Sequence, residues 1–384
     1  MVDGIKRTLV LATVVIGLLS YFMGQRSLHG QNPAHDGNPL AKWRPSQDNS
    51  GIKSVGSSTC ALCHTYQAST QLTTKMAHAL VSVADSEVLA KRPQLIFKNS
   101  PYTYQITRRG DQSYYTVSDG LRTISEPILY CFGQGKVSQV YIFRHDGFLY
   151  ESRVSYYRGI DGLDFTVRQP RSVPTSLDGA LGRPLGESEA RKCFGCHSTA
   201  AVSGNQLRLE RLIHGVSCEA CHGPGEQHIG AIKAKNFKDR RIFNPATLNA
   251  LELTQEFCGS CHMSFDQVML LPGQDGLNNV RFQPYRMFNS RGHNKNDSRL
   301  SCTACHDPHD NPEHEAAFYD AKCLACHLSG LKDIKTEART AAPCPVGTRQ
   351  CVTCHMPKVT LPDMHADFTD HWIRVVKPGD PIPR

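Results

Sequence analysis

Aromatic side chains are scarce in this chain: they make up 8% of its 384 residues, and only two of them are tryptophan. The mean hydropathy is also low, at −0.38. Length alone would allow two or three domains. So few large apolar side chains cannot build conventional cores on that scale, and the fold needs another source of apolar material to offset chain entropy.

The chain also lacks an uncharged run that reaches the roughly 20 residues of a comfortable membrane span. The strongest candidate, residues 8–23, follows Lys6 and Arg7, an arrangement typical of an export signal. No A-x-A-like cleavage site follows, which favours an uncleaved signal anchor over a cleaved signal peptide. Either one places the rest of the chain on the periplasmic side of a bacterial cytoplasmic membrane. Residues 24–56 are rich in Gly, Pro, Asn, Ser and Gln and are expected to form a flexible tether.

Cysteine, by contrast, is abundant: sixteen residues are too many for an ordinary cytosolic enzyme and indicate disulfides or metal ligands. Fourteen of them fall in a C-x-x-C-H pattern that occurs seven times, numbered here as motifs 1 to 7 in chain order. The cysteine pairs are Cys60 and Cys63, Cys193 and Cys196, Cys218 and Cys221, Cys258 and Cys261, Cys302 and Cys305, Cys323 and Cys326, and Cys351 and Cys354. The histidines that follow them are His64, His197, His222, His262, His306, His327 and His355.

The spacing of this pattern has a physical reason. On a helical turn, residues i, i+3 and i+4 share one face. Two thiols three residues apart can form thioethers with the two vinyl groups of one haem, and the next imidazole then reaches the iron. A zinc ribbon has no use for a histidine after each C-x-x-C, and a thioredoxin-like motif would occur once. The repeats therefore predict seven covalently attached haem c groups, with the seven motif histidines as proximal iron ligands.

These cofactors change the charge of the protein. The amino acids alone give +8 at pH 7. Each haem c with two ionised propionates adds about −1 when ferric and about −2 when ferrous, which brings the total to roughly +1 to −6. The basic composition is therefore no reason to expect a nucleic-acid partner.

The second axial position of each haem decides its chemistry, because an iron with two protein ligands transfers electrons whereas an open position can bind a substrate. Met76 and His78 both lie within reach of the first haem, but residues two apart on a helix face different sides, so only one of them can ligate. A Gly-Pro-Gly turn after motif 3 is expected to send His228 to a neighbouring haem. His145, in the turn-like R-H-D-G, is expected to be structural or exposed. The candidate distal ligands are Met76, His78, His214, His228, His293, His309, His314, His365 and His371.

Several segments resemble the multihaem c-type cytochrome superfamily. They are S-x-x-C-A-L-C-H…K-M-A-H-A, G-V-S-C-E-A-C-H-G-P-G-E-Q-H, L-S-C-T-A-C-H-D-P-H and C-V-T-C-H-M-P-K…H-A-D-F-T-D-H-W, within residues 55–83 and 189–376. The superfamily includes the tetrahaem cytochrome of ammonia oxidisers, octahaem hydroxylamine oxidoreductase, octahaem tetrathionate reductase and pentahaem nitrite reductase. The resemblance implies a fold built on closely packed haems. It also supports Met76 as a ligand, because the family usually has a histidine twelve residues after the first proximal histidine. The C-x-x-C-K motif of nitrite reductase is missing, so the catalytic members are poor guides to activity.

The pattern changes between motifs 1 and 2. Residues 94–168 carry no motif and contain alternating, β-rich runs such as Y-T-Y-Q-I-T-R and Q-V-Y-I-F-R, separated by R-R-G-D, S-D-G-L and H-D-G-F. These runs predict a small antiparallel sheet of four to six strands joined by tight turns. We interpret the sheet as a scaffold over the first haems, with a docking face or a channel lid as the alternative.

The predicted fold is mainly α-helical with long loops, organised around packed c-type haems, with a small antiparallel β-sheet insertion. The expected segments are an N-terminal signal anchor or signal peptide (1–23), the tether (24–56), a first haem-binding segment (57–93), the β-rich insertion (94–188), a six-haem domain (189–376) and a C-terminal tail (377–384).

These features together favour an exported heptahaem cytochrome that carries electrons between respiratory donors and acceptors. The expected partners are a quinol-oxidising complex or other cytochromes, together with the membrane through residues 8–23. The alternative is a multihaem reductase or oxidase of a small nitrogen or sulfur compound at one five-coordinate haem.

Overall fold

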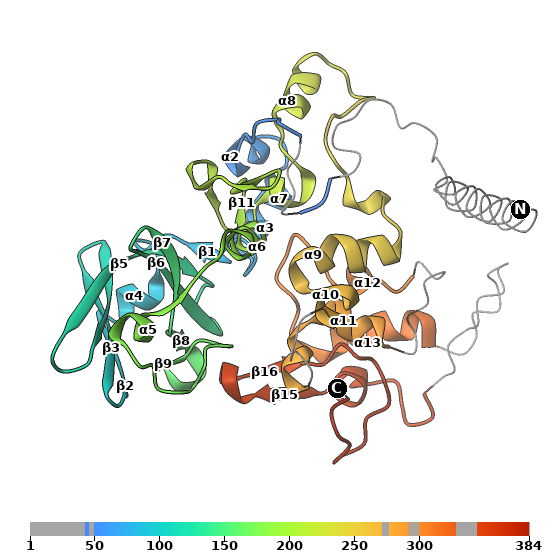
Figure 1. The fold of residues 1–384 in the computed structure, drawn as a ribbon. Helices are drawn as coiled ribbons and strands as arrows, with labels where there is room; N and C mark the ends of the chain where they lie inside the picture. Colours follow the sequence, from blue (N-terminus) through green and yellow to red (C-terminus); the bar gives the residue numbers. More distant parts are fainter. Residues whose placement is uncertain are drawn as a thin grey trace, which may run out of the picture. The chain divides into compact units, whose positions relative to one another are not determined.

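An antiparallel sheet of ten strands occupies the chain between the first two motifs (Figure 1). The computed structural model describes residues 43–45, 50–270, 276–290, 293, 299–327 and 344–383. The strand order is β10-β7-β6-β5-β4-β3-β2, with β1 paired to β5, β8 paired to β6, and β9 paired to β8. The strands are β1 Leu80–Val81, β2 Gln94–Asn99, β3 Tyr102–Arg109, β4 Gln112–Ser118, β5 Thr123–Phe132, β6 Ser138–His145, β7 Phe148–Ser152, β8 Val154–Tyr157, β9 Gly162–Phe165 and β10 Gly182–Pro184.

Short helices make up most of the regular structure outside the sheet. The α-helices are α2 Ser57–Ala61, α3 Thr65–Gln71, α4 Glu87–Lys91, α5 Leu177–Leu181, α6 Glu187–His197, α7 Cys218–His222, α8 Glu226–Lys233, α9 Gly259–His262, α10 Phe265–Met269, α11 Gln283–Phe288, α12 Cys302–Cys305, α13 Ala316–His327 and α14 Cys351–His355. A π-helix, η4, spans Glu252–Cys258, and the 3₁₀ turns are η1 Arg158–Ile160, η2 Leu209–Arg211, η3 Pro245–Thr247, η5 Leu277–Arg281 and η6 Pro362–Met364. Three two-stranded ribbons pair β11 Ser198–Thr199 with β14 Ile213–His214, β12 Val202–Ser203 with β13 Gln206–Leu207, and β15 Lys358–Leu361 with β16 Ala366–Thr369.

The three tight turns of the sheet lie where the glycine-containing tetrapeptides occur in the sequence. Gly110, between β3 and β4, has a positive φ of 61°. Between β4 and β5, a side-chain oxygen of Asp119 accepts the N–H groups of Leu121 (2.9 Å) and Arg122 (2.7 Å). Between β6 and β7, Asp146 (φ 47°) and Gly147 (φ 83°) both adopt the left-handed backbone that a type I′ hairpin requires.

The sheet contains more strands than the sequence predicts. β2 to β9 are eight strands between residues 94 and 165, where four to six are expected. The sequence pattern does not predict β8, because all four of its residues are buried. A strand buried on both faces lacks the alternation of apolar and polar residues by which a half-buried strand is identified.

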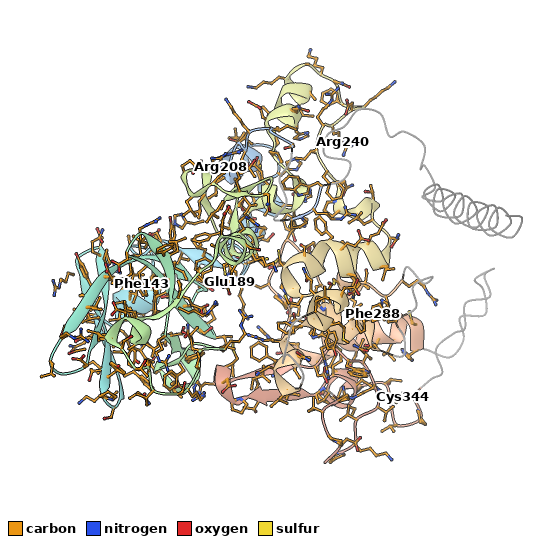
Figure 2. The ribbon with its side chains drawn as sticks, in the orientation of Figure 1. Phe143, Glu189, Arg208, Arg240, Phe288 and Cys344 are labelled. Atoms are coloured by element: carbon orange, nitrogen blue, oxygen red, sulfur yellow. The ribbon has the colours of Figure 1, made fainter. Side chains whose placement is uncertain are left out.

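Side chains of the sheet point alternately into two apolar layers. On one face, Cys131 and Phe143 join a buried cluster that includes residues of α4 and α5 (Figures 1 and 2). On the other face, Phe132 joins a second cluster that contains Phe194 of α6, the helix of motif 2. The sheet is thus held to the motif-bearing part of the chain through its second face.

The described part of the predicted tether is packed on the fold rather than free. Trp43 and Ile52 are buried, and the Trp43 indole N–H donates to the carbonyl of Ala220 (3.3 Å). These two apolar side chains anchor a segment whose overall composition is that of a linker. The described residues belong to a compact unit of residues 42–384, while the predicted anchor 8–23 lies outside the described residues. Among the described helices, none has both the length and the apolar character needed to cross a bilayer.

Candidate haem-binding sites

All seven motifs lie on or directly after a helical turn. Motif 1 begins in α2, motif 2 ends α6, motif 3 forms α7, motif 4 runs from η4 into α9, motif 5 begins in α12, motif 6 ends α13 and motif 7 forms α14. The first cysteine of each motif is helical, so the second one, three residues later, lies toward the same face. None of the cysteines is in a disulfide, so the fourteen motif thiols are available for attachment to haem vinyl groups.

Backbone carbonyl groups orient several of the motif histidines. Nδ1 of His197 donates to the carbonyl of Ala79 (3.1 Å), and Nδ1 of His222 donates to that of Phe243 (3.0 Å). Nδ1 of His355 likewise donates to the carbonyl oxygen of residue 374 (2.9 Å). Since a carbonyl can only accept, the proton is on Nδ1 and the lone pair of Nε2 is free to bind a metal. Burial lowers the pKa of His197 and of His222, which favours the neutral ring that metal ligation needs.

Three motif histidines have a second histidine ring opposite them. The ring centres are 6.5 Å apart for His64 and His228, 6.0 Å for His222 and His309, and 6.3 Å for His306 and His371. Two imidazoles that bind one iron from opposite sides, each through a metal–nitrogen bond of about 2 Å, have ring centres roughly 6 Å apart. The three observed separations therefore fit an iron between the rings.

Two of the facing histidines are oriented in the same way as the motif histidines. Nδ1 of His228, on α8, donates to the carbonyl of Arg240 (2.6 Å), and Nδ1 of His371 donates to the carbonyl of Thr369 (3.0 Å). Both rings therefore keep Nε2 available as the ligand atom. His309 follows motif 5 in the chain, yet its ring faces His222 of motif 3. The pairs thus join segments that are distant in the sequence.

The other candidate ligands are placed as follows. The carbonyl of Met76 accepts the N–H of Val216 (2.9 Å), two residues before motif 3. His78, two residues after Met76, is half-buried. His214 lies on β14 opposite Ser198, next to the second proximal histidine. The remaining three are His293, which contacts the ring of Phe288 (4.9 Å between centres), His314, which is exposed, and His365, whose Nε2 lies 2.8 Å from Asp164. Ligation by Met76, which the sequence favours for the first haem, stays a prediction; the structure brings the ring of His228 opposite His64.

The motif helices contact one another in two groups. α2 contacts α7, α6 contacts α9, η4 contacts α12, α12 contacts α13, and α13 contacts α14. Motif 3 is linked to motif 2 through β11, which directly follows α6 and contacts both α6 and α7. First cysteines of neighbouring motifs also meet: the contact with Cys218 raises the pKa of Cys60, and the contact with Cys302 raises that of Cys258. The seven attachment sites thus form one connected set.

Sheet residues cover the motif 2 site. The ring of Phe132 lies 5.1 Å from the ring of His197 and 5.0 Å from that of Phe194, and Tyr130 meets Phe194 edge-on at 4.9 Å. β5 carries both of these sheet aromatics and pairs with β1. Ala79, whose carbonyl accepts from His197, directly precedes β1. These contacts support the interpretation of the sheet as a scaffold over an early haem.

Two partly buried arginines have a buried nitrogen without a hydrogen-bond partner among the described residues: Nε of Arg281, in η5, and Nη2 of Arg374, whose backbone N–H donates to the carbonyl of His355 in motif 7 (3.3 Å). A buried guanidinium nitrogen without a partner destabilises the fold unless an anion accepts a hydrogen bond from it. The propionates of a haem are anions that Arg binds well. These two side chains fit the cofactor that the motifs predict. No group of three or more His, Cys, Asp or Glu side chains suited to a bare metal ion occurs in the described part of the chain.

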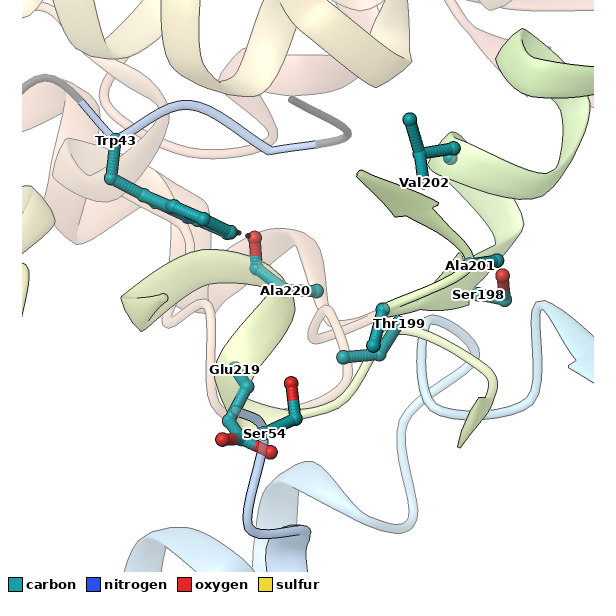
Figure 3. Close-up of a pocket in the computed structure, with 10 residues that line it drawn as sticks. Trp43, Ser54, Ser198, Thr199, Ala201, Val202, Glu219 and Ala220 are labelled. Atoms are coloured by element: carbon teal, nitrogen blue, oxygen red, sulfur yellow. Dashed lines mark hydrogen bonds between the residues drawn. The ribbon is translucent and has the colours of Figure 1, made fainter. Parts of the chain in front are cut away.

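A small hollow lies beside motifs 2 and 3 (Figure 3). It is lined by Trp43 and Ser54 from the N-terminal segment, Thr199 after motif 2, and Glu219 and Ala220 within motif 3. The sites predicted from the sequence do not include Glu219 or the carbonyl groups described above. The acidic residue inside a C-x-x-C-H motif was a visible signal, whereas a backbone carbonyl leaves none.

Comparison with known proteins agrees with this chemistry. The family described as cytochrome c554 and c-prime matches residues 176–223, which contain motifs 2 and 3. Over 208 residues the chain is 24% identical to the multiheme cytochrome MtrA of Shewanella baltica (strain OS185), covering 50% of this chain and 55% of the relative. The chain thus spans about half the length of that curated relative, and no solved structure matches significantly. With the repeated C-x-x-C-H motifs, these similarities support a multihaem c-type cytochrome and imply covalently bound haem.

Proposed function

We propose that this protein carries electrons along a series of seven haems, one at each motif. The observation that carries the proposal is the connected set of contacts from α2 to α14, in which β11 links the helix of motif 3 to that of motif 2. Haems attached to helices in contact lie close together, and electron tunnelling slows steeply as the distance between cofactors grows. A connected set of attachment sites therefore supports rapid transfer from one end of the series to the other. The similarity to a multihaem cytochrome supports the same role.

The facing histidine pairs support a carrier rather than an enzyme. Motifs 1, 3 and 5 each have a second imidazole at the separation that an iron between two rings requires. An iron ligated on both sides has no position at which a substrate can bind. These three sites are therefore suited to changing oxidation state without chemistry on a substrate.

The two ends of the series are the most accessible attachment sites. Cys63 of motif 1, Cys326 of motif 6 and Cys354 of motif 7 are exposed, whereas the cysteines of motifs 2 to 5 are partly covered. We place the docking sites of redox partners, either other cytochromes or a quinol-oxidising complex, at motif 1 and at motifs 6 and 7. Export to the periplasmic side, with residues 8–23 as the anchor, belongs to the same proposal and is supported by Lys6 and Arg7 before the apolar run.

Spectroscopy of the matured protein tests the proposal. The intact mass is expected to show seven haem additions, and the electron paramagnetic resonance spectrum of the oxidised protein is expected to show low-spin haem at motifs 1, 3 and 5. His228→Ala is expected to convert one low-spin haem to high spin, because it removes the ring opposite His64. His145→Gln is the matched control, since His145 binds Glu126 within the sheet (2.7 Å) and should leave the spectrum unchanged.

Reduction by a one-electron donor and reoxidation by a second cytochrome are then followed by stopped-flow absorbance. Rapid passage of electrons with no consumption of nitrite, hydroxylamine or tetrathionate is the expected result. A wild-type protein with a high-spin haem that binds nitrite or cyanide and turns over such a compound would instead favour the multihaem reductase or oxidase. A colourless matured protein would overturn both functions.

A further inference from the structure

Glu219 occupies an unusual position for an acidic side chain. It lies between the two cysteines of motif 3, and only 3% of it is exposed. A buried carboxylate is costly unless donors surround it. Here three backbone N–H groups do so: Oε1 accepts from Val55 (2.8 Å) and Gly225 (2.7 Å), and Oε2 accepts from Gly56 (2.8 Å). Acceptance of three N–H bonds by two oxygens is the pattern of an ionised carboxylate.

The three donors come from two different segments. Val55 and Gly56 directly precede α2, the helix in which motif 1 begins. Gly225 ends the turn after motif 3 and directly precedes α8. The carboxylate therefore joins the start of motif 1, the helix of motif 3 and the start of α8 at one point. Figure 3 shows Glu219 close to Ser54, where the N-terminal segment crosses motif 3.

This junction joins the two segments that carry the facing rings of His64 and His228. Motif 1 ends at His64, and His228 is the third residue of α8. Their ring centres are 6.5 Å apart, within the range that fits an iron between them. The junction is also tightly packed: a Cβ atom at Gly225 would lie 2.9 Å from Cγ2 of Val55. A change in the junction is therefore expected to move one ring relative to the other.

The charge of Glu219 reaches both attachment sites. It directly follows Cys218 of motif 3, and it binds the N–H of Gly56 (2.8 Å), whose carbonyl accepts the thiol of Cys60 in motif 1 (3.5 Å). A buried negative charge stabilises the ferric form of a nearby haem relative to the ferrous form, because the ferric form carries one more positive charge. Glu219 can therefore affect both sites through its hydrogen bonds and through its charge.

A second carboxylate repeats the arrangement at the other end of the series. Asp320, on α13 three residues before motif 6, is 7% exposed. Its two oxygens accept the N–H groups of Gln350 and Cys351, each at 2.8 Å, at the start of motif 7. Here too a buried carboxylate from one motif helix binds the beginning of its neighbour.

We propose that Glu219 is a positioning residue for the haems of motifs 1 and 3: its carboxylate holds His228 opposite His64 and lowers the reduction potential of both haems. Asp320 lowers the potentials at motifs 6 and 7 in the same way. The inference rests on haem attachment at these motifs, but not on the protein being an electron carrier.

The test separates charge from position with three variants of the matured, full-length protein. Glu219→Gln keeps the length of the side chain and removes its charge, whereas Glu219→Asp keeps the charge and shortens the reach. Glu226→Gln is the matched control, because Glu226 lies on the same turn, is exposed, and accepts only a 3.3 Å bond from the N–H of Lys53. Intact mass gives the haem content of each, and potentiometric titration followed by electron paramagnetic resonance gives potentials and spin states.

Glu219→Gln is expected to raise the potentials of two haems and leave the others unchanged. Glu219→Asp is expected to weaken the low-spin signal of one haem, the same one that His228→Ala abolishes. Asp320→Asn should raise the potentials of two other haems. Wild-type potentials in Glu219→Gln at full haem content would overturn the inference, as would equal shifts in Glu226→Gln. Absence of haem from the wild-type protein would overturn the proposed function instead, so the two failures are distinguishable.

Discussion

Asp370→Asn is the substitution whose effect the structure defines most closely. Asp370 is completely buried, and its carboxylate receives two guanidinium groups. Arg286 donates to both oxygens at 2.8 Å, and Arg374 donates to Oδ2 at 2.7 Å. The N–H of Trp372 donates to Oδ1 at 3.0 Å. His371, the ring opposite His306, lies between Asp370 and Trp372 in the chain, so the cluster supports both the fold and a candidate ligand.

Asparagine preserves the shape of this side chain but replaces one oxygen by an amide that donates. In place of Oδ2 that amide would face the donors Arg286 Nη2 and Arg374 Nη1, and in place of Oδ1 it would face Arg286 Nε and the N–H of Trp372. The buried guanidinium of Arg286 and the partly buried one of Arg374 would also lose their counter-charge. Removing one partner of a buried ion pair costs about 3–5 kcal/mol. Against a total stability of roughly 5–15 kcal/mol, this is a large fraction. It corresponds to a roughly hundred- to several-thousand-fold change in the unfolding equilibrium.

The assay is denaturant unfolding of the holoprotein at pH 7, followed by far-ultraviolet circular dichroism and by the Soret band. Asp367→Asn is the control, because Asp367 is exposed and binds only the Thr360 hydroxyl (2.6 Å); its expected cost is below about 1 kcal/mol. The oxidised Asp370→Asn protein should also show a weakened low-spin signal from the His306–His371 haem. Equal stability of the two variants would show that the buried cluster is not a main support of this region.

Two further predictions concern the sheet. The side chain of Phe194 has no exposed surface and contacts the rings of Tyr130 and Phe132. Phe194→Ala is expected to destabilise the holoprotein by about 3–5 kcal/mol, whereas Phe194→Leu should cost less than about 1.5 kcal/mol. Equal thermal unfolding midpoints of the two variants would refute the scaffold role of the sheet. The bond to Glu126 and a longer one to Asp178 raise the pKa of His145 above 6.5. Its stabilisation, at most about 1 kcal/mol, is therefore fully present below the unfolded pKa and is lost as pH rises through the folded pKa. Stability measured against pH should show this loss in the wild type, and His145→Gln should lack it.

Local chemistry made the attachment sites predictable. A C-x-x-C-H motif needs only one helical turn to bring two thiols and an imidazole to one side, so each motif is complete within five residues. The hairpin turns were equally local, because Asp146 and Gly147 readily adopt the left-handed backbone that a two-residue loop requires. β8 was missed because burial on both faces removes the alternation that identifies a strand.

The second ligands could not be assigned in this way. His228 and His64 are far apart in the sequence, and so are His371 and His306; their rings meet only because the motif helices pack against one another. The sequence supplied nine candidates and a preference for Met76, but no distance between any of them and an iron.

The sequence by itself determined where haem is bonded to the chain, because thioether formation and proximal ligation depend on residues within one turn. Only the tertiary structure decided which histidines face each other, which carbonyl groups and carboxylates orient them, and how the attachment sites connect. These properties arise from contacts between segments separated by tens to hundreds of residues, and such contacts depend on the packing of the whole fold rather than on any local pattern.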